Sequence, residues 1–585
     1  MNGPTAARSK GEIEMSKRKT IVLKFGSSVL RSEADLPSAV HEIYRHWREG
    51  KQVIAVVSAF GDTTDQLTQR AERLCVQPDH STLAALLATG ETASSALLGV
   101  ALNRTGIPSR LLDPVQAGLR TVGGKLEADP VAVDTARLHA ESKRAVVVLP
   151  GFVGRAEQGD TTLLGRGGSD FSALFLAHHL RADCILLKDV DGLYTSDPAS
   201  QTVRAARFEQ ASYDTALRLG GTVVQHRAVR FASANKLRFT ITKIGCAAFT
   251  EIGSFVDRID TSGTSLEPVR VALLGCGTIG GGVFERLTAL PELFTVIGVG
   301  TRSTNCARTA GVSDSLVTSD LEALVAKPCD VVVELIGGTT RAADLTERAL
   351  RRGREVVSAN KALMAHAGPE LEELAAERGV TLRYSAAVGG VLPALETIRR
   401  VRANGPVRGF SGVLNGTTNF VLDRLAQGDD MGVAVRDAQE HGYTEADPHA
   451  DLDGIDAAEK LILLTRAAFD FNLPMNAVAR RGLEGLNPRI LRNVHEQGKI
   501  VRLIADCQRI AGRIKASVRP VELPLDHPFA QVSGVENKLI VESEAGEPIT
   551  VSGKGAGRWP TTEAVMADLF DLRCSQTVVA LEACA

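Results

Sequence analysis

A glycine-rich turn between a short apolar run and a helical segment constrains this chain more than any other feature. The apolar run is Val269–Leu274, the glycines that follow are spaced Gly-x-Gly-x-x-Gly, and residues 281–290 are a helical stretch. A strand, a glycine turn and a helix in this order bring backbone N–H groups close to a pyrophosphate. A glycine turn without a ligand is the alternative, but the flanking strand and helix favour dinucleotide binding. The residues expected at the cofactor are Gly275, Gly277, Thr278, Ile279 and Gly280.

Composition argues against several functional classes. Of 585 residues, 44% are hydrophobic and 23% charged, as in ordinary globular proteins. Lysine and arginine number 67 against 69 acidic residues, a balance that argues against nucleic-acid or anionic-membrane binding. No apolar run approaches the roughly 20 residues that span a bilayer. The nine cysteines lack the spacing of a zinc or redox site, so free thiols in a cytoplasmic protein are expected.

The residues after the next two strands bear on the type of cofactor. The strand expected at Thr295–Gly300 leads into Thr-Arg302-Ser, where NAD sites usually carry Asp or Glu. A guanidinium and two hydroxyl groups suit a 2′-phosphate, so NADP is favoured over NAD; a solvated surface charge is the alternative for Arg302. The strand expected at 330–336 leads into Gly337-Gly338-Thr339, where the two glycines would let the backbone approach the nicotinamide ribose. Gly337 and Thr339 are therefore expected at the cofactor.

Six segments of the second half resemble, in order, those of homoserine dehydrogenases. They are 330–338, 358–361, 412–419, 442–448, 451–460 and 553–557. The resemblance implies reversible NAD(P)H-dependent reduction of aspartate 4-semialdehyde to homoserine. It also implies that Lys460 is the proton donor and Lys361 a second catalytic lysine that also borders the cofactor. In the same way it places Glu445 and Asp456 at the amino acid end of the substrate, and Gly442 and Gly557 near the cofactor.

The residues themselves support part of this assignment. Reduction of an aldehyde requires a positive donor where the oxygen becomes an alkoxide, and a lysine ammonium supplies charge and proton. Asp456 and Lys460 are four residues apart on an expected helix and therefore share a face. A surface ion pair is the commoner result of this spacing. A neighbouring cluster of carboxylates favours recognition of a substrate ammonium instead: Glu445, Asp447, Asp451 and Asp453.

Residues 384–393 resemble the monovalent-cation loop of the same family. Backbone carbonyl groups would hold the ion, so the expected ligands are Val388, Gly390 and Leu392. The family typically has an acidic residue at the position of Ser385, and an ordinary glycine turn is the alternative.

The first half, across roughly residues 20–256, resembles aspartokinases. The matching segments are 56–65, 90–91, 164–170 and 189–198, after a Lys24-Phe-Gly26-Ser-Ser28 turn that is closer to glutamate 5-kinase. The resemblance implies Mg²⁺-ATP as the phosphate donor. It assigns phosphate contacts to Lys24 and Gly26, and makes Asp170 the organiser of the transfer site. The expected substrate residues are Glu91, Ser28 and Ser169, and the expected nucleotide residues are Asp189, Asp191 and Tyr194.

Three features depart from the aspartokinase pattern. The opening turn is one glycine short, and Thr222 stands where the family has a lysine that holds ATP phosphates. Lys188 stands where the family usually has threonine and is a candidate substitute for the missing charge. A kinase-like module without catalysis, and a kinase acting on glutamate, therefore remain alternatives to aspartate phosphorylation. Only residues 243–268 separate the last strand of this half from Val269, too few for a regulatory ACT domain.

Together these observations predict an amino-acid-kinase-type α/β sandwich followed by a Rossmann domain with an inserted α+β catalytic and dimerisation domain. A bifunctional enzyme of this kind would catalyse the first and third steps of the threonine and methionine branch, and its family suggests a homo-oligomer. The expected parts are a flexible leader at 1–19, the kinase-type domain at 20–256, a linker at 257–268, the Rossmann domain at 269–394, the catalytic domain at 395–545 and a return segment at 546–585.

Overall fold

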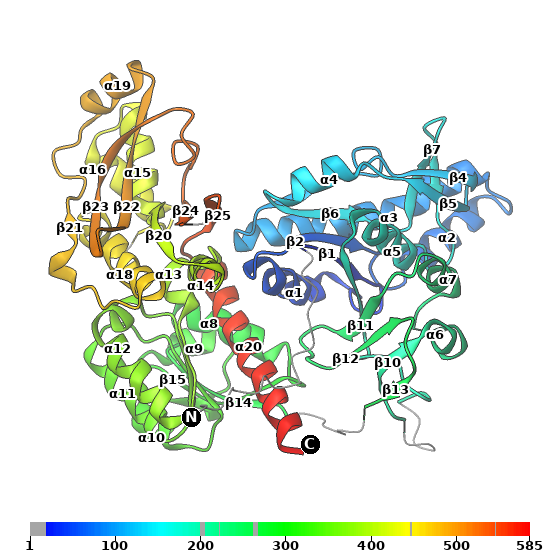
Figure 1. Ribbon diagram of the computed structural model, residues 1–585, viewed down its shortest axis with the longest axis horizontal. Coiled ribbons are helices and arrows are strands. Elements are labelled where there is room, and N and C mark those ends of the chain that lie inside the picture. The colour runs from blue at the N-terminus through cyan, green and yellow to red at the C-terminus, as the bar shows by residue number, and fades with distance from the viewer. Residues whose placement is uncertain are drawn as a thin grey trace, which may run out of the picture. The chain divides into compact units, whose positions relative to one another are not determined.

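The computed structural model of the chain describes residues 19–198, 205–221, 223–260, 267–444, 447–544 and 546–584 (Figure 1). These residues form two compact units, and each is described by itself. The described parts of Met1–Asp35, Lys51–Leu97 and Arg110–Thr261 belong to the first unit. Those of Leu36–Gly50, Leu98–Ser109 and Ser262–Ala585 belong to the second.

The first unit is organised around a large sheet whose centre is parallel. Strand β1 (Thr20–Phe25) lies between β2 (Gln52–Val57) and β9 (Asp183–Lys188) and runs parallel to both. All six residues of β1 are buried, as its apolar run predicts. The full order is β13-β10-β12-β11-β9-β1-β2-β6-β3. The remaining strands are β3 (Ser109–Leu111), β6 (Val146–Pro150), β10 (Phe208–Ser212), β11 (Phe239–Lys243), β12 (Phe249–Gly253) and β13 (Arg258–Ile259).

Helices and a small second sheet complete this half of the sequence. The small sheet has the order β5-β4-β7-β8. Its strands are β4 (Arg120–Gly124), β5 (Glu127–Ala132), β7 (Val153–Ala156) and β8 (Thr161–Leu163). The helices are α1 (Leu36–Arg48), α2 (Thr63–Leu74), α3 (His80–Thr105), α4 (Thr135–Ser142), α5 (Gly168–Leu180), α6 (Tyr213–Leu219) and α7 (His226–Ala234). Among the described residues, α3 alone has the length and apolar composition of a membrane span, and half of its apolar window is buried in the protein.

The second unit opens with a doubly wound nucleotide-binding sheet. Its six strands are all parallel, in the order β16-β15-β14-β17-β18-β19. Chain order thus runs outward from β14 in both directions, which is the Rossmann order with its switch point between β14 and β17. The predicted Rossmann fold is confirmed. The strands are β14 (Val269–Leu274), β15 (Phe294–Gly300), β16 (Val317–Thr318), β17 (Val331–Glu334), β18 (Glu355–Ser358) and β19 (Leu382–Arg383).

The rest of the second unit is an α+β layer. Its mainly antiparallel sheet has the order β21-β23-β22-β20-β24-β25, and buried helix α18 (Ile455–Phe469) shares its core. The strands are β20 (Val407–Val413), β21 (Ala479–Arg480), β22 (Lys499–Ile510), β23 (Arg513–Pro524), β24 (Glu536–Ser543) and β25 (Ile549–Lys554). The other helices are α8 (Thr278–Thr288), α9 (Thr304–Thr309), α10 (Leu321–Ala326), α11 (Thr340–Arg351), α12 (Lys361–Arg378), α13 (Ser385–Gly389), α14 (Ala394–Asn404), α15 (Gly416–Gln427), α16 (Met431–Glu440), α17 (His449–Leu452), α19 (Pro488–Glu496) and α20 (Arg558–Cys584).

The last helix packs on the nucleotide-binding layer. Val565, Leu569 and Phe570 of α20 lie in one hydrophobic core with Val283 and Leu287 of α8. The chain therefore leaves the Rossmann layer after β19 and its last helix returns to that layer, so the α+β layer is an insertion in the sequence of the Rossmann domain.

We expect replacement of the first glycine of the turn, Gly275, to destabilise the fold, and replacement of the second, Gly277, to leave its stability unchanged. Gly275 has φ +103°, and a Cβ there would lie 2.5 Å from the carbonyl oxygen of Leu335. Gly277 has φ −82° and open space around it. Gly275→Ala should therefore cost about 1–3 kcal/mol of stability, because it combines a left-handed backbone with a clash. Thermal unfolding measures this, and an equal loss in Gly277→Ala would contradict it.

Candidate active sites

A buried carboxylate lies between two lysines in the second unit. Asp456 is on the first turn of α18, and Lys460 is one turn later with its Nζ 2.9 Å from Asp456 Oδ2. Lys361 begins α12, and its Nζ lies 3.1 Å from Asp456 Oδ1. The Lys460 side chain is 7% exposed, whereas that of Lys361 is 39% exposed. The pair spaced i, i+4 is thus not a surface ion pair, and the structure adds a second cation to it.

Neutral groups fix the geometry of this cluster. Lys460 donates to the carbonyl oxygen of Leu414 at 2.8 Å, and Asn537 donates to the same oxygen at 2.9 Å. Asn415, the N-cap of α15, donates to Asp456 at 2.8 Å and to Asp451 at 2.6 Å. The Lys460 ammonium and the Asp456 carboxylate are therefore each held in position by more than one contact.

The charges in the cluster depend on one another. Burial alone would favour the neutral acid, but Lys460 and Lys361 outweigh it and hold the pKa of Asp456 well below its usual range. The Asp456 carboxylate in turn raises the pKa of Lys361 above its ordinary value, against the effect of burial. By formal charge the two lysines and Asp456 leave one excess positive charge, which the nearby carboxylates of Asp451 and Glu459 oppose.

The turns after β14 and β17 form a candidate dinucleotide site. Gly277 is the N-cap of α8, so Thr278, Ile279 and Gly280 place their backbone on the first turn of that helix. A Cβ on Gly280 would lie 2.1 Å from the carbonyl oxygen of Gly275, which accounts for the third glycine of the pattern. Arg302 is exposed beyond the end of β15. The open cradle at Gly277 and the free helix terminus fit a pyrophosphate.

A buried glutamate supports the second turn of this candidate site. Glu334, at the end of β17, accepts hydrogen bonds from Ser358 Oγ at 2.6 Å and from the Ile336 amide at 3.0 Å. Asn360 donates to the Gly338 carbonyl oxygen at 2.7 Å and, at 3.4 Å, to Glu334. Burial raises the pKa of Glu334 above its ordinary value, against these hydrogen bonds. This network fixes the turn that contains Gly337 and Thr339, and it places that turn beside Asn360, the residue before Lys361.

The remaining residues assigned in the second half take varied positions. Gly442 and Gly557 have positive φ angles of 69° and 115° at turns. Asp447 and Asp453 of the acidic cluster are exposed, while Asp451 joins the site through Asn415. Glu445 lies outside the described residues.

The expected cation ligands occupy the end of α13 and the turn after it. They are Val388, Gly390 and Leu392, all buried. The carbonyl oxygen of Leu392 already accepts a hydrogen bond from the Ala394 amide at 2.7 Å. The amide of Ser385 donates to Asp568 at 3.0 Å, so a carboxylate does lie beside the position where the family has an acid. The cation site stays a prediction.

The first unit repeats the arrangement of one carboxylate between two lysines. Lys24, near the end of β1, has its Nζ 2.7 Å from Asp170 Oδ1, and Lys188, at the end of β9, has its Nζ 2.9 Å from Oδ2. All three residues are buried. A Cβ on Gly26 would lie 2.7 Å from Lys24 Nζ, so this glycine leaves room for the ammonium. Parallel strands bring both lysines to the same edge of the sheet.

Burial and charge shift the pKa values around this triad. Burial lowers the pKa of Lys24 to about 8, although Asp170 opposes it. The pKa of Asp170 falls to about 2, because Lys188 and Lys24 outweigh its burial. Glu91, on α3, is 3% exposed and its Oε2 has no partner among the described residues; burial raises its pKa to about 7.

The other residues assigned in the first half lie around the same sheet edge. Ser169 is buried on the first turn of α5 next to Asp170, whereas Ser28 is exposed in the turn after β1. Tyr194 donates to Asp191 at 2.6 Å, and Asp189 is exposed directly after β9. Thr222 lies outside the described residues.

The family matches fall on these sites. Residues 275–385 match the family described as homoserine dehydrogenase, NAD binding domain, and residues 393–570 match homoserine dehydrogenase. The homoserine dehydrogenase of Synechocystis sp. is 34% identical over 316 residues, which cover 52% of this chain and 73% of that protein. The chain belongs to the homoserine dehydrogenase family. Residues 19–243 match the amino acid kinase family, so this homoserine dehydrogenase carries a kinase-type domain before its NAD-binding domain.

Two further relatives support the assignment. The homoserine dehydrogenase of Mycobacterium tuberculosis is 37% identical over 318 residues, which cover 52% of this chain and 72% of that protein. Among solved structures, a homoserine dehydrogenase from Thiobacillus denitrificans superposes with a TM-score of 0.51 at 33% identity, covering 54% of this chain and 75% of that one. The predicted order of kinase-type, Rossmann and catalytic parts is confirmed.

Several residues that shape the two sites were not singled out by the sequence analysis. They are Glu334, Ser358, Asn360, Leu414, Asn415 and Asn537. All but Asn537 lie in or beside the segments that resemble the family, so polar residues at strand ends within those segments were the available signal. Asn537 lies on β24 and carried no such signal.

Glu91 should make the stability of this homoserine dehydrogenase pH-dependent. Its pKa is about 7 when folded, against 4.5 for an exposed glutamate, so the folded chain binds more protons between these values. Stability from this group is therefore complete below pH 4.5 and is lost as pH rises towards 7. The loss should be about 3 kcal/mol at most.

Unfolding of the full chain at pH 5 and pH 8 measures this effect. Glu91→Gln should flatten the difference between the two pH values, whereas Glu157→Gln, at an exposed position, should not. An unchanged pH dependence in Glu91→Gln would show that Glu91 is not the titrating group.

Proposed function

We propose that the second unit reduces aspartate 4-semialdehyde to homoserine with NADPH. The observation that carries the proposal is Asp456 held between Lys361 and Lys460, with the Lys460 ammonium buried and fixed on the Leu414 carbonyl. A lysine ammonium fixed in a buried site stabilises an oxygen that becomes negative during reaction.

The residues of this cluster divide the work of aldehyde reduction. As hydride reaches the carbonyl carbon, the oxygen gains negative charge, and Lys460 transfers a proton to it to give the alcohol. Asp456 and the Leu414 carbonyl hold the ammonium in place, which keeps its proton directed into the site. Lys361, partly exposed, contributes a second positive charge at the open side, and Glu445 and Asp456 would bind the substrate ammonium.

The nucleotide-binding layer fits a nicotinamide cofactor. The cradle at Gly277 and the first turn of α8 would hold the pyrophosphate, and Arg302 would pair with a 2′-phosphate, which favours NADP. When bound, the nicotinamide supplies the hydride. Gly337 and Thr339 would border its ribose, while Gly442 and Gly557 would close the site. Val388, Gly390 and Leu392 remain proposed ligands of a monovalent cation.

We propose further that the first unit phosphorylates aspartate with Mg²⁺-ATP. Phosphoryl transfer depends mainly on positioning and charge neutralisation, and the Lys24–Asp170–Lys188 triad also holds one excess positive charge. Lys188 supplies a cation at the sheet edge where Lys24 lies, which supports activity despite Thr222. Glu91 and Ser169 would bind the amino acid, and Asp189, Asp191 and Tyr194 the nucleotide.

The larger context of the enzyme is also proposed. A cytoplasmic homo-oligomer with separate active sites would catalyse two steps of the same pathway. The bounds 20–256, 269–394 and 395–545 remain the proposed limits of its domains.

Two substitutions in the full chain should separate the two activities. Lys460→Ala should lower NADPH-linked reduction by about 10²–10⁴-fold, because the proton donor is lost, and leave NADPH affinity unchanged. Asp170→Asn should remove ATP-linked phosphorylation and leave the reduction intact, so each variant is the control for the other. A near-normal reduction rate in Lys460→Ala would refute the assignment of the proton donor.

The same assay distinguishes the alternatives for the first unit. Phosphate transfer to aspartate supports the proposal, transfer to glutamate alone reassigns the substrate, and no transfer by the unmodified chain identifies a binding or assembly module.

Arg302 should determine the preference between the two cofactors. Arg302→Ala should weaken NADPH binding by about 10- to 100-fold, as expected for one charge-assisted contact, and leave NADH within twofold. Fluorescence titration with each cofactor measures this. Arg308→Ala, at another exposed arginine of the same region, is the control, and an equal loss for both cofactors would contradict the assignment.

A further inference from the structure

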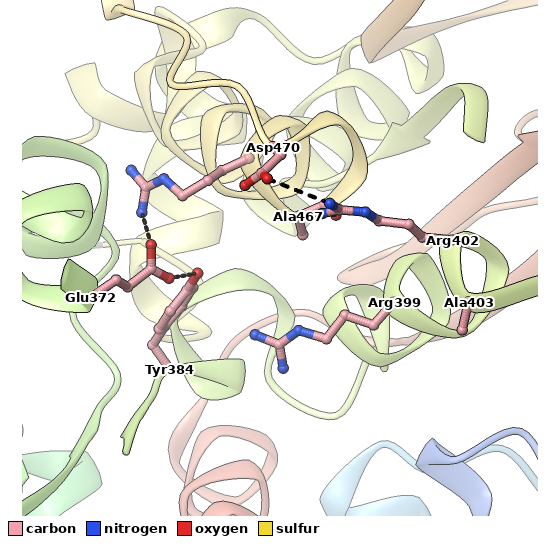
Figure 2. A pocket seen from close by; sticks show the side chains of 8 residues that line it. Glu372, Tyr384, Arg399, Arg402, Ala403, Ala467 and Asp470 are labelled. Atoms are coloured by element: carbon pink, nitrogen blue, oxygen red, sulfur yellow. Dashed lines mark hydrogen bonds and ion pairs between the residues drawn. The ribbon is translucent and has the colours of Figure 1, made fainter. Parts of the chain in front are cut away.

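A charged cavity lies in the second unit and contains none of the residues assigned to the dehydrogenase or kinase site. Its volume is about 490 Å³, within the range of small-molecule sites. Residues of α12, α14 and α18, with the turns next to β19 and α18, form its walls (Figure 2). The lining residues are Glu372, Tyr384, Arg399, Arg402, Ala403, Arg466, Ala467 and Asp470.

Two of the three arginines in the cavity are already paired. Arg466 lies 3.4 Å from Glu372, and Arg402 lies 3.6 Å from Asp470. The Tyr384 hydroxyl donates to the other oxygen of Glu372 at 2.5 Å, and its burial, with Glu372, raises the pKa of Tyr384 to about 12. The positive charges of these two arginines are therefore neutralised by the two carboxylates with which they pair.

Arg399 is the third arginine of the cavity. It projects from α14 towards Tyr384, and within the described part of the chain it has no hydrogen bond or ion pair (Figure 2). With three arginines and two carboxylates, the cavity holds one excess positive charge, and Arg399 carries it. A guanidinium presents parallel N–H groups that match the two oxygens of a carboxylate. The carboxylates in the walls disfavour a ligand with several negative charges.

The cavity is joined to the active site through Arg466. Its guanidinium donates to the Met364 carbonyl of α12 at 3.1 Å and pairs with Glu372 of the same helix, although Arg466 itself is on α18. Helix α12 begins at Lys361, and α18 carries Asp456 and Lys460. Arg466 thus holds together the two helices that position the catalytic cluster.

We propose that this cavity is a binding site for a small carboxylate, which pairs with Arg399 and, through the clamp of Arg466 and Glu372, changes the rate of the dehydrogenase. The ligand's carboxylate lies on the Arg399 guanidinium. Its negative charge near Arg466 weakens the Arg466–Glu372 pair and so alters how α12 and α18 pack. The binding part of this proposal is independent of the proposed function, while the effect on rate rests on it.

Calorimetric titration of the full chain with propionate, which carries a single negative charge, at ionic strength held constant with chloride, tests binding directly. Arg399→Ala should weaken binding by about 10- to 100-fold. Arg489→Ala, which removes an exposed arginine of α19, should leave it unchanged. Equal propionate affinity in the unmodified chain and Arg399→Ala, or no binding at all, would overturn the site. Tighter binding of inorganic phosphate than of propionate would overturn the choice of a carboxylate.

The rate of reduction gives the second measurement. Propionate should change the turnover of the unmodified enzyme and leave that of Arg399→Ala at its value without ligand, which should equal the normal rate. Calorimetric binding without any change in turnover would overturn the coupling through Arg466. Failure of the enzyme to reduce the semialdehyde would instead count against the proposed function, since binding is measured separately.

Discussion

Each unit of this protein depends on a buried carboxylate held between two lysine ammonium groups. Burying an ion pair costs several kcal/mol per charge, and the attraction offsets this only when geometry and additional hydrogen bonds are good. Asp456 meets that condition through Lys361, Lys460 and Asn415. Asp170 meets it through Lys24 and Lys188. Removing either carboxylate would leave two cations facing one another, so the carboxylate fixes the geometry of the whole site.

This arrangement is suited to catalysis because two lysines share one carboxylate, so their positive charges are not fully neutralised by it. A single lysine paired with a carboxylate is neutral and offers little attraction to a developing oxyanion. Two lysines on one carboxylate leave one positive charge in a poorly solvated place, where electrostatic interactions are strong. In the second unit that charge suits an alkoxide, and in the first it suits phosphoryl oxygens. The same arrangement thus occurs on two unrelated sheets, where we propose that it serves two reactions.

The sequence predicted the parts of this architecture that depend on local pattern. Apolar runs such as Thr20–Lys24 became fully buried parallel strands, and the glycine turn after Val269–Leu274 became the first turn of a Rossmann fold. The spacing of Asp456 and Lys460 placed both on one face of a helix, as expected from helical periodicity. Periodicity could not show whether that face was buried. The surface ion pair, which is the commoner result of this spacing and was the alternative, does not occur because α18 lies inside the core.

Local sequence pattern could not predict the contacts between segments that are far apart in the chain. Lys361 and Asp456 are far apart in sequence, and only the resemblance to a family suggested that they share a site. Leu414 contributes a backbone carbonyl, which no side-chain pattern reveals, and Asn537 reaches that carbonyl from another strand. From the sequence, Glu334 is simply the last residue of an apolar strand. In the structure its carboxylate organises the turn that follows β17 and binds Asn360.

The first unit shows how such a contact changes an argument based on family pattern. The absence of lysine at Thr222 suggested a site short of one positive charge, and Lys188 was a candidate replacement without a known position. In the folded chain β9 runs parallel to β1, so Lys188 emerges at the edge of the sheet where Lys24 lies. Its ammonium donates to both carboxylate oxygens of Asp170, one of which also accepts from Lys24. Phosphoryl transfer requires positive charge at a particular position in the site. The parallel strands bring Lys188 to that position from a different part of the sequence.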